Sequence, residues 1–273
     1  MTVRAALAAA AQRLSTCSET ARLDAELLMA HSLGLSREAL LLGHLDDEAP
    51  PQFDALVERR SRGEPVAYIT GRKGFWTLDL KVTPDVLIPR ADSETLIEAS
   101  IARLPRGSAP RILDLGTGSG ALLLAALSEW PLAWGLGVDR LEAAIRVARE
   151  NAALTGLSDR AAFIVGDWAA ALSGPFDLIF CNPPYIASEA ELPRDVADFE
   201  PATALYAGPD GLDDYRRILP EIERLLAPEG LSCIEIGYDQ AAAVSGLARN
   251  AGLEASVVRD LAGRDRCLVL SQT

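Results

Sequence analysis

The chain has 273 residues, of which 26 are basic and 39 acidic, so its net charge is −13, and 49% of its residues are hydrophobic. This length suits one or two domains, and the apolar content excludes a disordered chain. The acidic excess disfavours binding to nucleic-acid backbones, which depends on many Lys and Arg contacts. We expect a protein or small-molecule partner, with no direct nucleic-acid partner. No membrane partner is expected either, because no apolar run approaches the roughly 18 residues of a membrane helix.

The four cysteines and two histidines show neither the spacing of a zinc site nor that of a Cys/His catalytic pair. We therefore expect no metal, reduced thiols and a monomeric, cytoplasmic protein. Arg4 and Arg13 flank an Ala-rich stretch that faintly resembles a cleavable targeting peptide. An ordinary first helix is preferred, because the helical pattern continues beyond this stretch.

Short amphipathic helices are predicted for the first part of the chain, where apolar residues recur at three- and four-residue spacing. They define an expected N-terminal helical domain over residues 1–64. Residues 65–84 are expected to form a β-hairpin linker, with strands at 66–70 and 75–82 around a turn at 71–74.

Residues 85–273 are expected to form a second domain of the α/β class. Here β-rich runs alternate with helical ones, which predicts a parallel sheet covered on both faces. The expected strands are 111–115, 134–139, 162–166, 176–181, 231–236, 254–259 and 266–271.

The last two expected strands are joined by only residues 260–265. A parallel crossover needs a dozen or more residues, so these strands must be antiparallel. A doubly wound, seven-stranded sheet with an antiparallel last strand distinguishes the class I methyltransferases, which use S-adenosylmethionine, from the all-parallel dinucleotide-binding folds.

A glycine-rich turn follows the first strand of this domain and consists of Gly116, Thr117, Gly118, Ser119 and Gly120. Glycines at such a turn let the backbone approach a ligand closely, with the helix N–H groups facing it. The turn would also suit a nicotinamide or flavin enzyme, or serve only as a tight turn.

Acidic and aromatic residues end the next two strands. Asp139 lies 23 positions after Gly116, a spacing typical of a carboxylate that binds the ribose of an adenosine cofactor, although it could instead cap the helix that follows. Asp167 could accept from the adenine amine, and Trp168 could stack on the ring or simply fill the core. Together these features favour an adenosine cofactor.

The fourth strand ends in Asn182, Pro183, Pro184 and Tyr185. The prolines lack N–H donors and hold the adjacent carbonyls rigid, so those carbonyls are free to accept hydrogen bonds. The Asn182 side-chain oxygen and the Pro183 carbonyl could each accept from a planar NH₂ group, while Tyr185 stacks on its plane. This arrangement indicates methyl transfer to nitrogen in which proximity supplies much of the acceleration; a Pro-rich turn without function is the alternative.

The NPPY motif after a GTGSG loop resembles the amino-methyltransferases, and the wider chain resembles the glutamine methyltransferases that act on peptide chain release factors. The matching segments are GEPVAYITG (63–71), VLIPRADSE (86–94), RILDLGTGSGA (111–121), FDLIFCNPPYI (176–186), FEPATAL (199–205), DGLDDYR (210–216), IEIG (234–237) and DLAGRDR (260–266). The family commonly has R-P-E-T-E where this chain has R-A-D-S-E at 90–94, which puts the fine positioning of that loop in question.

The resemblance implies transfer of a methyl group from S-adenosylmethionine to the amide nitrogen of the glutamine in the Gly-Gly-Gln motif of release factors. It implies cofactor contacts at the 116–120 turn, Asp139, Trp168 and Asn182, and substrate contacts at 182–185. The helical domain would help to dock the release factor.

Two other functions remain as alternatives. A DNA or RNA adenine methyltransferase would suit the NPPY geometry, but it must extrude a base and hold a charged backbone, which the net charge of −13 disfavours. A cofactor-binding module without catalysis would have no need of the convergent amide acceptors.

Overall fold

The computed structural model describes residues 1–273, which divide into two compact units. The first comprises Met1–Arg72 together with Leu192–Phe199, and the second comprises Lys73–Glu191 and Glu200–Thr273. No helix in either unit is long and apolar enough to cross a membrane.

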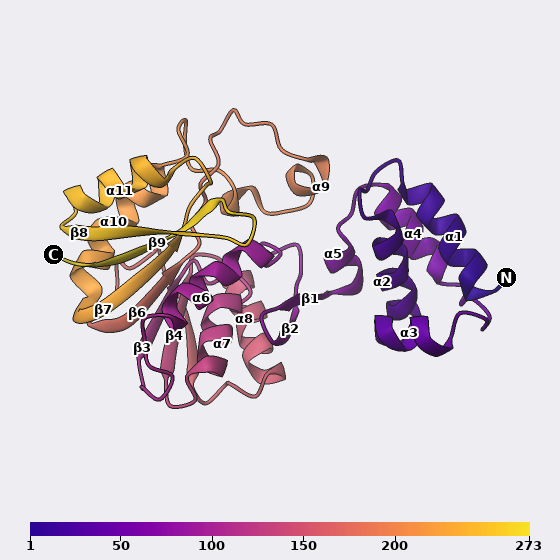
Figure 1. The fold of residues 1–273 in the computed structure, drawn as a ribbon, viewed down its shortest axis with the longest axis horizontal. Helices are drawn as coiled ribbons and strands as arrows, with labels where there is room; N and C mark the ends of the chain where they lie inside the picture. Colours follow the sequence, from indigo (N-terminus) through magenta and orange to yellow (C-terminus); the bar gives the residue numbers. More distant parts are fainter. The chain divides into compact units, whose positions relative to one another are not determined.

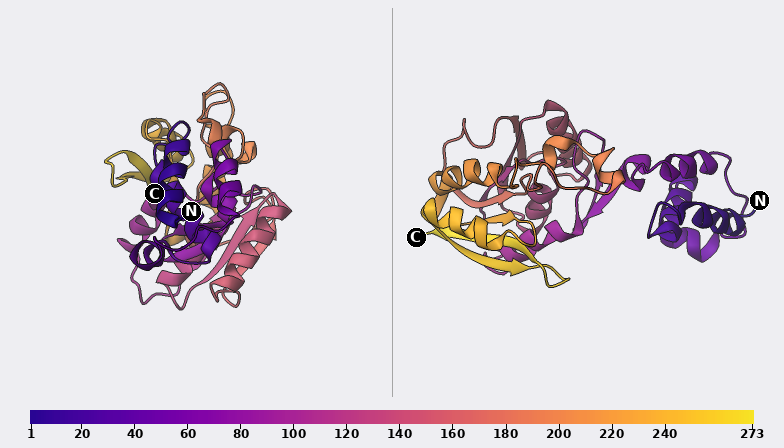
Figure 2. Two further views of the ribbon diagram at one scale, coloured as in Figure 1. Left: turned by 90° about the vertical axis from the view of Figure 1, so that its right-hand side faces the viewer. Right: turned by 90° about the horizontal axis from the view of Figure 1, so that it is seen from above.

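The first unit is helical (Figures 1 and 2). Its helices enclose a small core to which Leu7, Leu28, Leu40 and Phe53 contribute from four different helices. The helices are α1 (Val3–Leu14), α2 (Ala21–Leu33), α3 (Arg37–Gly43), α4 (Phe53–Ser61), α5 (Val66–Thr70) and α9 (Arg194–Ala197). The first helix begins at Val3 after Thr2, whose hydroxyl accepts from the Ala5 N–H, and it buries one face in this core, so the predicted ordinary first helix is confirmed.

A buried ion pair joins two helices of this unit. Arg60 of α4 donates to Asp24 of α2 at 2.7 Å, and both side chains are only 8% exposed. Asp24 also accepts from the hydroxyls of Ser18 and Thr20. The carboxylate thus satisfies three donors, which is the condition under which a buried charge is tolerated.

The expected strand at 66–70 is wrong, because Val66–Thr70 forms the short helix α5. The segment is rich in residues that favour strands, but Pro65 and Gly71 bound it closely. Pro65 cannot continue a ladder and precedes the first turn, while Gly71 ends the helix in the left-handed conformation at φ 70°.

The two-stranded sheet lies further along the chain than expected. It pairs β1 (Arg72–Phe75) with β2 (Leu78–Lys81). The connection is therefore 76–77 rather than the predicted turn at 71–74, and Trp76 takes a positive φ of 55° there.

The second unit is built on a seven-stranded sheet in the order β5-β4-β3-β6-β7-β9-β8 (Figure 1). The pairs from β5 to β7 are parallel, whereas β9 is antiparallel to both of its neighbours. This confirms the predicted fold and its reversed last strand. The strands are β3 (Arg111–Leu115), β4 (Trp134–Asp139), β5 (Ala161–Val165), β6 (Phe176–Cys181), β7 (Leu226–Glu235), β8 (Leu253–Arg259) and β9 (Asp265–Gln272).

Helices cover the sheet on both faces, in two separate apolar clusters. One cluster contains residues of α6 (Glu94–Ile101), α7 (Ala121–Glu129) and α8 (Glu142–Leu154). The other contains residues of α10 (Asp213–Leu225) and α11 (Ala241–Asn250), and Figures 1 and 2 show α11 lying along β8 and β9. Two buried faces account for the nearly continuous apolar strands in the sequence.

The ion pair in the helical unit leads to a stability prediction. Asp24→Ala leaves the Arg60 guanidinium buried and unpaired, which is expected to cost about 3–5 kcal/mol. Arg4→Ala is the control, because its pair with Asp46 is exposed (62% and 86%) and should be worth less than about 1 kcal/mol. Hydrogen exchange read by mass spectrometry on peptides of α2 and α4 measures both. Equal protection in the two variants would contradict the prediction.

Candidate functional site

The candidate site is a cavity at the carboxyl edge of the parallel strands. β3 pairs with β4 on one side and with β6 on the other, in registers that place Leu115 opposite Val138 and Cys181. The loops that follow these strands therefore start side by side. This is the edge at which open α/β sheets bind ligands.

Most of the residues predicted for the site line this cavity. They are Gly116, Thr117, Gly118, Ser119, Asp139, Asp167, Trp168, Asn182 and Pro184. Gly120, Pro183 and Tyr185 belong to the same loops but are not part of the cavity lining. Further lining residues come from segments that the sequence reasoning did not assign to the site: Phe75, Asp85, Val86, Leu87, Pro89, Ser93, Asp114, Pro201, Thr203, Ala204 and Asp214.

Gly116 shows why glycine is needed in the turn after β3. Its φ is +72°, and a Cβ built on it would lie 3.0 Å from the Trp168 ring. The Trp168 side chain, itself at a positive φ of 48°, therefore packs directly on the backbone of the glycine turn. Its Nε1 donates to Asp214 at 3.2 Å, which fixes the ring at one side of the cavity.

Asp139 combines the two roles considered for it. One carboxylate oxygen accepts from the Gly118 N–H at 3.0 Å, and the other accepts from the Leu141 N–H at 2.9 Å, directly before α8. The side chain thus holds the glycine turn against the start of the helix. It also lines the cavity, where each oxygen keeps a lone pair for a ligand hydroxyl.

The two acidic residues near Trp168 differ in their surroundings. Asp167 pairs with Arg217 at 2.6 Å on an exposed part of the surface. Asp214 is half-buried, and burial raises the pKa of its carboxyl even though Trp168 and Arg217 oppose the shift. Asp214 was missed in the sequence because it lies at the start of a helix far along the chain from the glycine turn.

Asp114 is a second acidic residue that the sequence reasoning missed. It is 1% exposed in the middle of the apolar strand β3, and burial raises the pKa of its carboxyl to about 7. Thr117 donates to its Oδ2 at 2.6 Å, while its buried Oδ1 has no hydrogen-bond partner. A buried polar atom without a partner, in a cavity wall that also carries Asp139, suits a ligand that hydrogen-bonds there.

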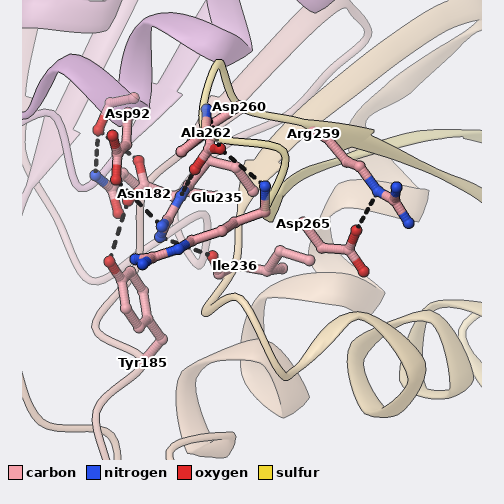
Figure 3. A network of polar contacts seen from close by, with 12 residues as sticks. Asp92, Asn182, Tyr185, Glu235, Ile236, Arg259, Asp260, Ala262 and Asp265 are labelled. Atoms are coloured by element: carbon pink, nitrogen blue, oxygen red, sulfur yellow. Dashed lines mark hydrogen bonds and ion pairs between the residues drawn. The ribbon is translucent and has the colours of Figure 1, made fainter.

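The NPPY segment is tied to the rest of the unit by hydrogen bonds at both ends. Asn182 Nδ2 donates to Ser93 Oγ at 3.2 Å, and the Tyr185 hydroxyl donates to Glu235 Oε1 at 3.2 Å (Figure 3). Burial beside Glu235 raises the pKa of the Tyr185 hydroxyl well above its usual value. Tyr185 therefore remains a neutral hydrogen-bond donor at physiological pH.

A further buried carboxylate holds the loop that carries Ser93. Glu200 accepts from the Ile88 N–H at 3.2 Å and forms an ion pair with Arg90. These contacts join two of the segments on which the family resemblance rests, VLIPRADSE and FEPATAL. Next to them, the Glu94 carboxylate accepts from the Trp76 N–H at 2.8 Å, so the R-A-D-S-E departure leaves the loop anchored at both ends.

The cavity thus combines a close-approach glycine turn, a flat aromatic wall, five carboxyl groups and a rigid amide. Glycine and Trp168 can hold a flat ring, and Asp114 and Asp139 can hydrogen-bond a ligand. Asn182 can hydrogen-bond a planar polar group on the opposite side.

Comparison with protein families matches both parts of the chain. A model described as the PrmC N-terminal domain matches residues 5–71, and one described as a methyltransferase domain matches residues 107–256. The release factor glutamine methyltransferase of Rhodospirillum rubrum is 49% identical over 92% of this chain and 79% of that protein. The one of Caulobacter vibrioides is 44% identical over 90% of this chain and 88% of that protein.

Comparison with solved structures supports the methyltransferase fold. A methyltransferase from Pyrococcus furiosus aligns with a TM-score of 0.54 at 18% identity, over 80% of this chain and 95% of that one. At this identity the likeness concerns the fold alone.

The raised pKa of Asp114 predicts how stability depends on pH. The native state holds a proton on this carboxyl up to pH about 7, whereas the unfolded chain releases it near pH ~4, so the native state binds more protons in this window. The free energy of unfolding should therefore fall as pH rises from ~4 to ~7, by on the order of a few kcal/mol from this group.

The asparagine of Asp114→Asn cannot ionise, so the free energy of unfolding of this variant should lack the decrease that Asp114 causes between pH ~4 and ~7. Chemical denaturation at a series of pH values measures it in both proteins. Identical pH slopes for the wild type and Asp114→Asn would contradict the assignment.

Proposed function

Since this chain belongs to the release factor glutamine methyltransferase family, we propose that it transfers a methyl group from S-adenosylmethionine to the side-chain amide nitrogen of a release-factor glutamine, the one in the Gly-Gly-Gln motif. One observation carries the proposal: Asn182 of the NPPY segment lines the same cavity as the glycine turn and Asp139. The cofactor and the acceptor amide would therefore meet in one enclosure, where proximity supplies much of the rate.

The proposed cofactor residues are Gly116, Thr117, Gly118, Ser119, Gly120, Asp139, Asp167, Trp168 and Asn182. The orphaned Oδ1 of Asp114 supports a ligand in this cavity, because a buried polar atom in the wall has no hydrogen-bond partner within the protein. The positive φ of Gly116, and the Trp168 ring that packs on this glycine, likewise fit a flat base held close to the backbone. When bound, S-adenosylmethionine supplies an activated methyl group, so the reaction requires no metal.

The proposed substrate residues are Asn182, Pro183, Pro184 and Tyr185. Asn182 Oδ1 and the Pro183 carbonyl each accept an N–H of the glutamine amide and draw the nitrogen out of conjugation with its carbonyl. The prolines fix the backbone between the two acceptors. Tyr185 stacks against the amide plane while its hydroxyl remains bonded to Glu235.

The helical domain at residues 1–64 is proposed to dock the release factor. Its match to the PrmC N-terminal domain supports a role specific to this family. Contacts remote from the reacting amide would then supply binding energy that a free amino acid cannot. The protein is proposed to act as a monomer in the cytoplasm without binding nucleic acid.

The direct test is methyl transfer from labelled S-adenosylmethionine to a purified release factor. Wild type should label the release factor, but not one whose motif glutamine is replaced by alanine, and free glutamine should be a very poor substrate.

Asn182→Ala should bind the cofactor with modest loss and transfer the methyl group at least about a hundredfold more slowly, because the amide acceptor acts on the reacting nitrogen. Equal rates for the variant at saturating substrates would remove the role from Asn182. Label in DNA or RNA adenine would instead support the nucleic-acid alternative.

Asp139→Ala tests the cofactor assignment separately. Loss of a charge-assisted hydrogen bond to the ribose hydroxyls should weaken S-adenosylmethionine binding by about 1.5–3 kcal/mol in calorimetry. Glu142→Ala is the matched control, because it removes a charge from the first turn of the same helix outside the cavity. Unchanged binding in a folded Asp139→Ala protein would leave Asp139 only its role at the start of α8.

A further inference from the structure

A buried chain of hydrogen bonds connects Asn182 to a carboxylate on the neighbouring strand β7, which is distant in the sequence (Figure 3). Asn182 Nδ2 donates to Ser93 Oγ at 3.2 Å, and Ser93 Oγ donates to Glu235 Oε2 at 2.5 Å. Glu235 lies at the end of β7 and is 1% exposed, and Ser93 is also buried. Three segments widely separated in the sequence thus meet behind the amide group.

The chemistry of the end group gives this chain one direction. Both Glu235 oxygens accept hydrogen bonds, from the Tyr185 hydroxyl and from Ser93 Oγ, so the single proton of the Ser93 hydroxyl points to Glu235. Ser93 Oγ is then left with lone pairs alone and must accept from its other neighbour. Asn182 therefore turns its NH₂ group towards Ser93, and its Oδ1 is the atom left for a substrate N–H.

The same carboxylate holds the other end of the NPPY segment. Its Oε1 accepts from the Tyr185 hydroxyl, while Oε2 is engaged by Ser93. Between Asn182 and Tyr185 lie two prolines with fixed φ, so anchoring both ends restricts the whole segment.

In the structure both oxygens of Glu235 are acceptors, Oε2 from the Ser93 hydroxyl and Oε1 from the Tyr185 hydroxyl. Burial raises the pKa of the carboxyl, and Ser93, Arg266 and Tyr185 oppose this shift. Arg266 of β9 is itself held by Asp92 at 3.1 Å and by Asp260 at 3.4 Å. The backbone carbonyl of Glu235 also accepts from the Tyr215 hydroxyl at 2.9 Å, which fixes this strand end from the other face of the sheet.

We propose that Ser93 and Glu235 are positioning residues that set the orientation of the Asn182 amide, so that its oxygen and not its nitrogen faces the acceptor glutamine. The expected effect of Ser93 and Glu235 on the rate of methylation rests on the proposed function. Its structural content, the direction of the hydrogen-bond chain, can be measured in the free protein.

Ser93→Ala is the first variant, with Ser232→Ala as its matched control. Ser232 is a buried serine on the same strand as Glu235, and its hydroxyl has no hydrogen-bond partner. Ser93→Ala should lower kcat for release-factor methylation by about tenfold to a hundredfold and leave the Kd for S-adenosylmethionine little changed. Ser93→Thr, which keeps the hydroxyl, should recover most of the rate, and Ser232→Ala should match wild type.

Glu235→Gln tests the direction of the chain. A glutamine has one acceptor oxygen in place of two, so Ser93 and Tyr185 can no longer both donate to residue 235. With the glutamine NH₂ facing Ser93, the Ser93 proton turns to Asn182 and favours the flipped amide. This variant should lose about as much rate as Ser93→Ala, and the double variant should be no slower than either, since both act through one chain. Losses that multiply in the double variant, or a Ser93→Ala rate equal to that of Ser232→Ala, would overturn the proposal.

A measurement without substrate separates this outcome from failure of the proposed function. The side-chain amide signals of Asn182, assigned in ¹⁵N spectra by their loss in Asn182→Ala, should exchange slowly with water in wild type and Ser232→Ala, and faster in Ser93→Ala and Glu235→Gln. If these exchange rates are observed but the protein does not methylate release factors, the proposed orientation of the Asn182 amide stands and only the proposed function is refuted. Unchanged exchange in Ser93→Ala would refute the orientation whatever the activity.

Discussion

The parallel pairing of β3 with β4 on one side and β6 on the other is the constraint on which the site depends. It places the glycine turn, Asp139 and Asn182 at one edge of the sheet, although these residues lie far apart in the sequence. Each loop is then tied to its neighbour by a side chain. Asp139 bonds the Gly118 N–H, and the ring of Trp168 packs on Gly116. The loops that carry Asp139 and Trp168 are thus both held against the glycine turn.

Much of this arrangement could be predicted from the sequence because it follows from local patterns. Alternating strands and helices indicated the sheet, and the short 260–265 connection required an antiparallel last pair, which β8 and β9 form. The residues predicted at the strand ends lie around one cavity for the same reason, since parallel strands end at a common edge. The segment 66–70 was the local failure, because its strand-forming residues are too few to outweigh Pro65 and Gly71.

What the sequence could not indicate depends on contacts between distant segments. Ser93, Asp114, Asp214 and Glu235 lie in segments that resemble the family, but neither composition nor spacing assigns these four side chains a role. In the sequence, Asp114 is one polar residue inside an apolar strand. Only the structure shows that its Oδ1 has no hydrogen-bond partner. Glu235 gains a role only when β7 brings it beside Ser93, which lies 142 positions earlier in the sequence. A single carboxylate at the end of a buried strand could be interpreted only once its neighbours were known.

The place of β9 in the sheet has a consequence for how the protein folds. β9 lies between β7 and β8, so β8 can join the sheet only through β9. β9 also carries Arg266, next to Cys267, which pairs with Glu235 in the register of β7. β8 and β9 are close in the sequence, since Arg259 pairs with Asp265, whereas β3 and β6 pair distant segments such as Ile112 and Leu178. Because nearby segments lose less entropy on closing the chain, β8 and β9 are expected to form a hairpin early, which then adds to β7 through β9. The pairing of β9 with β7 places Arg266 beside the end of β7, so the ion pair of Arg266 with Asp92 next to the NPPY segment forms in the same step that adds this hairpin to the sheet.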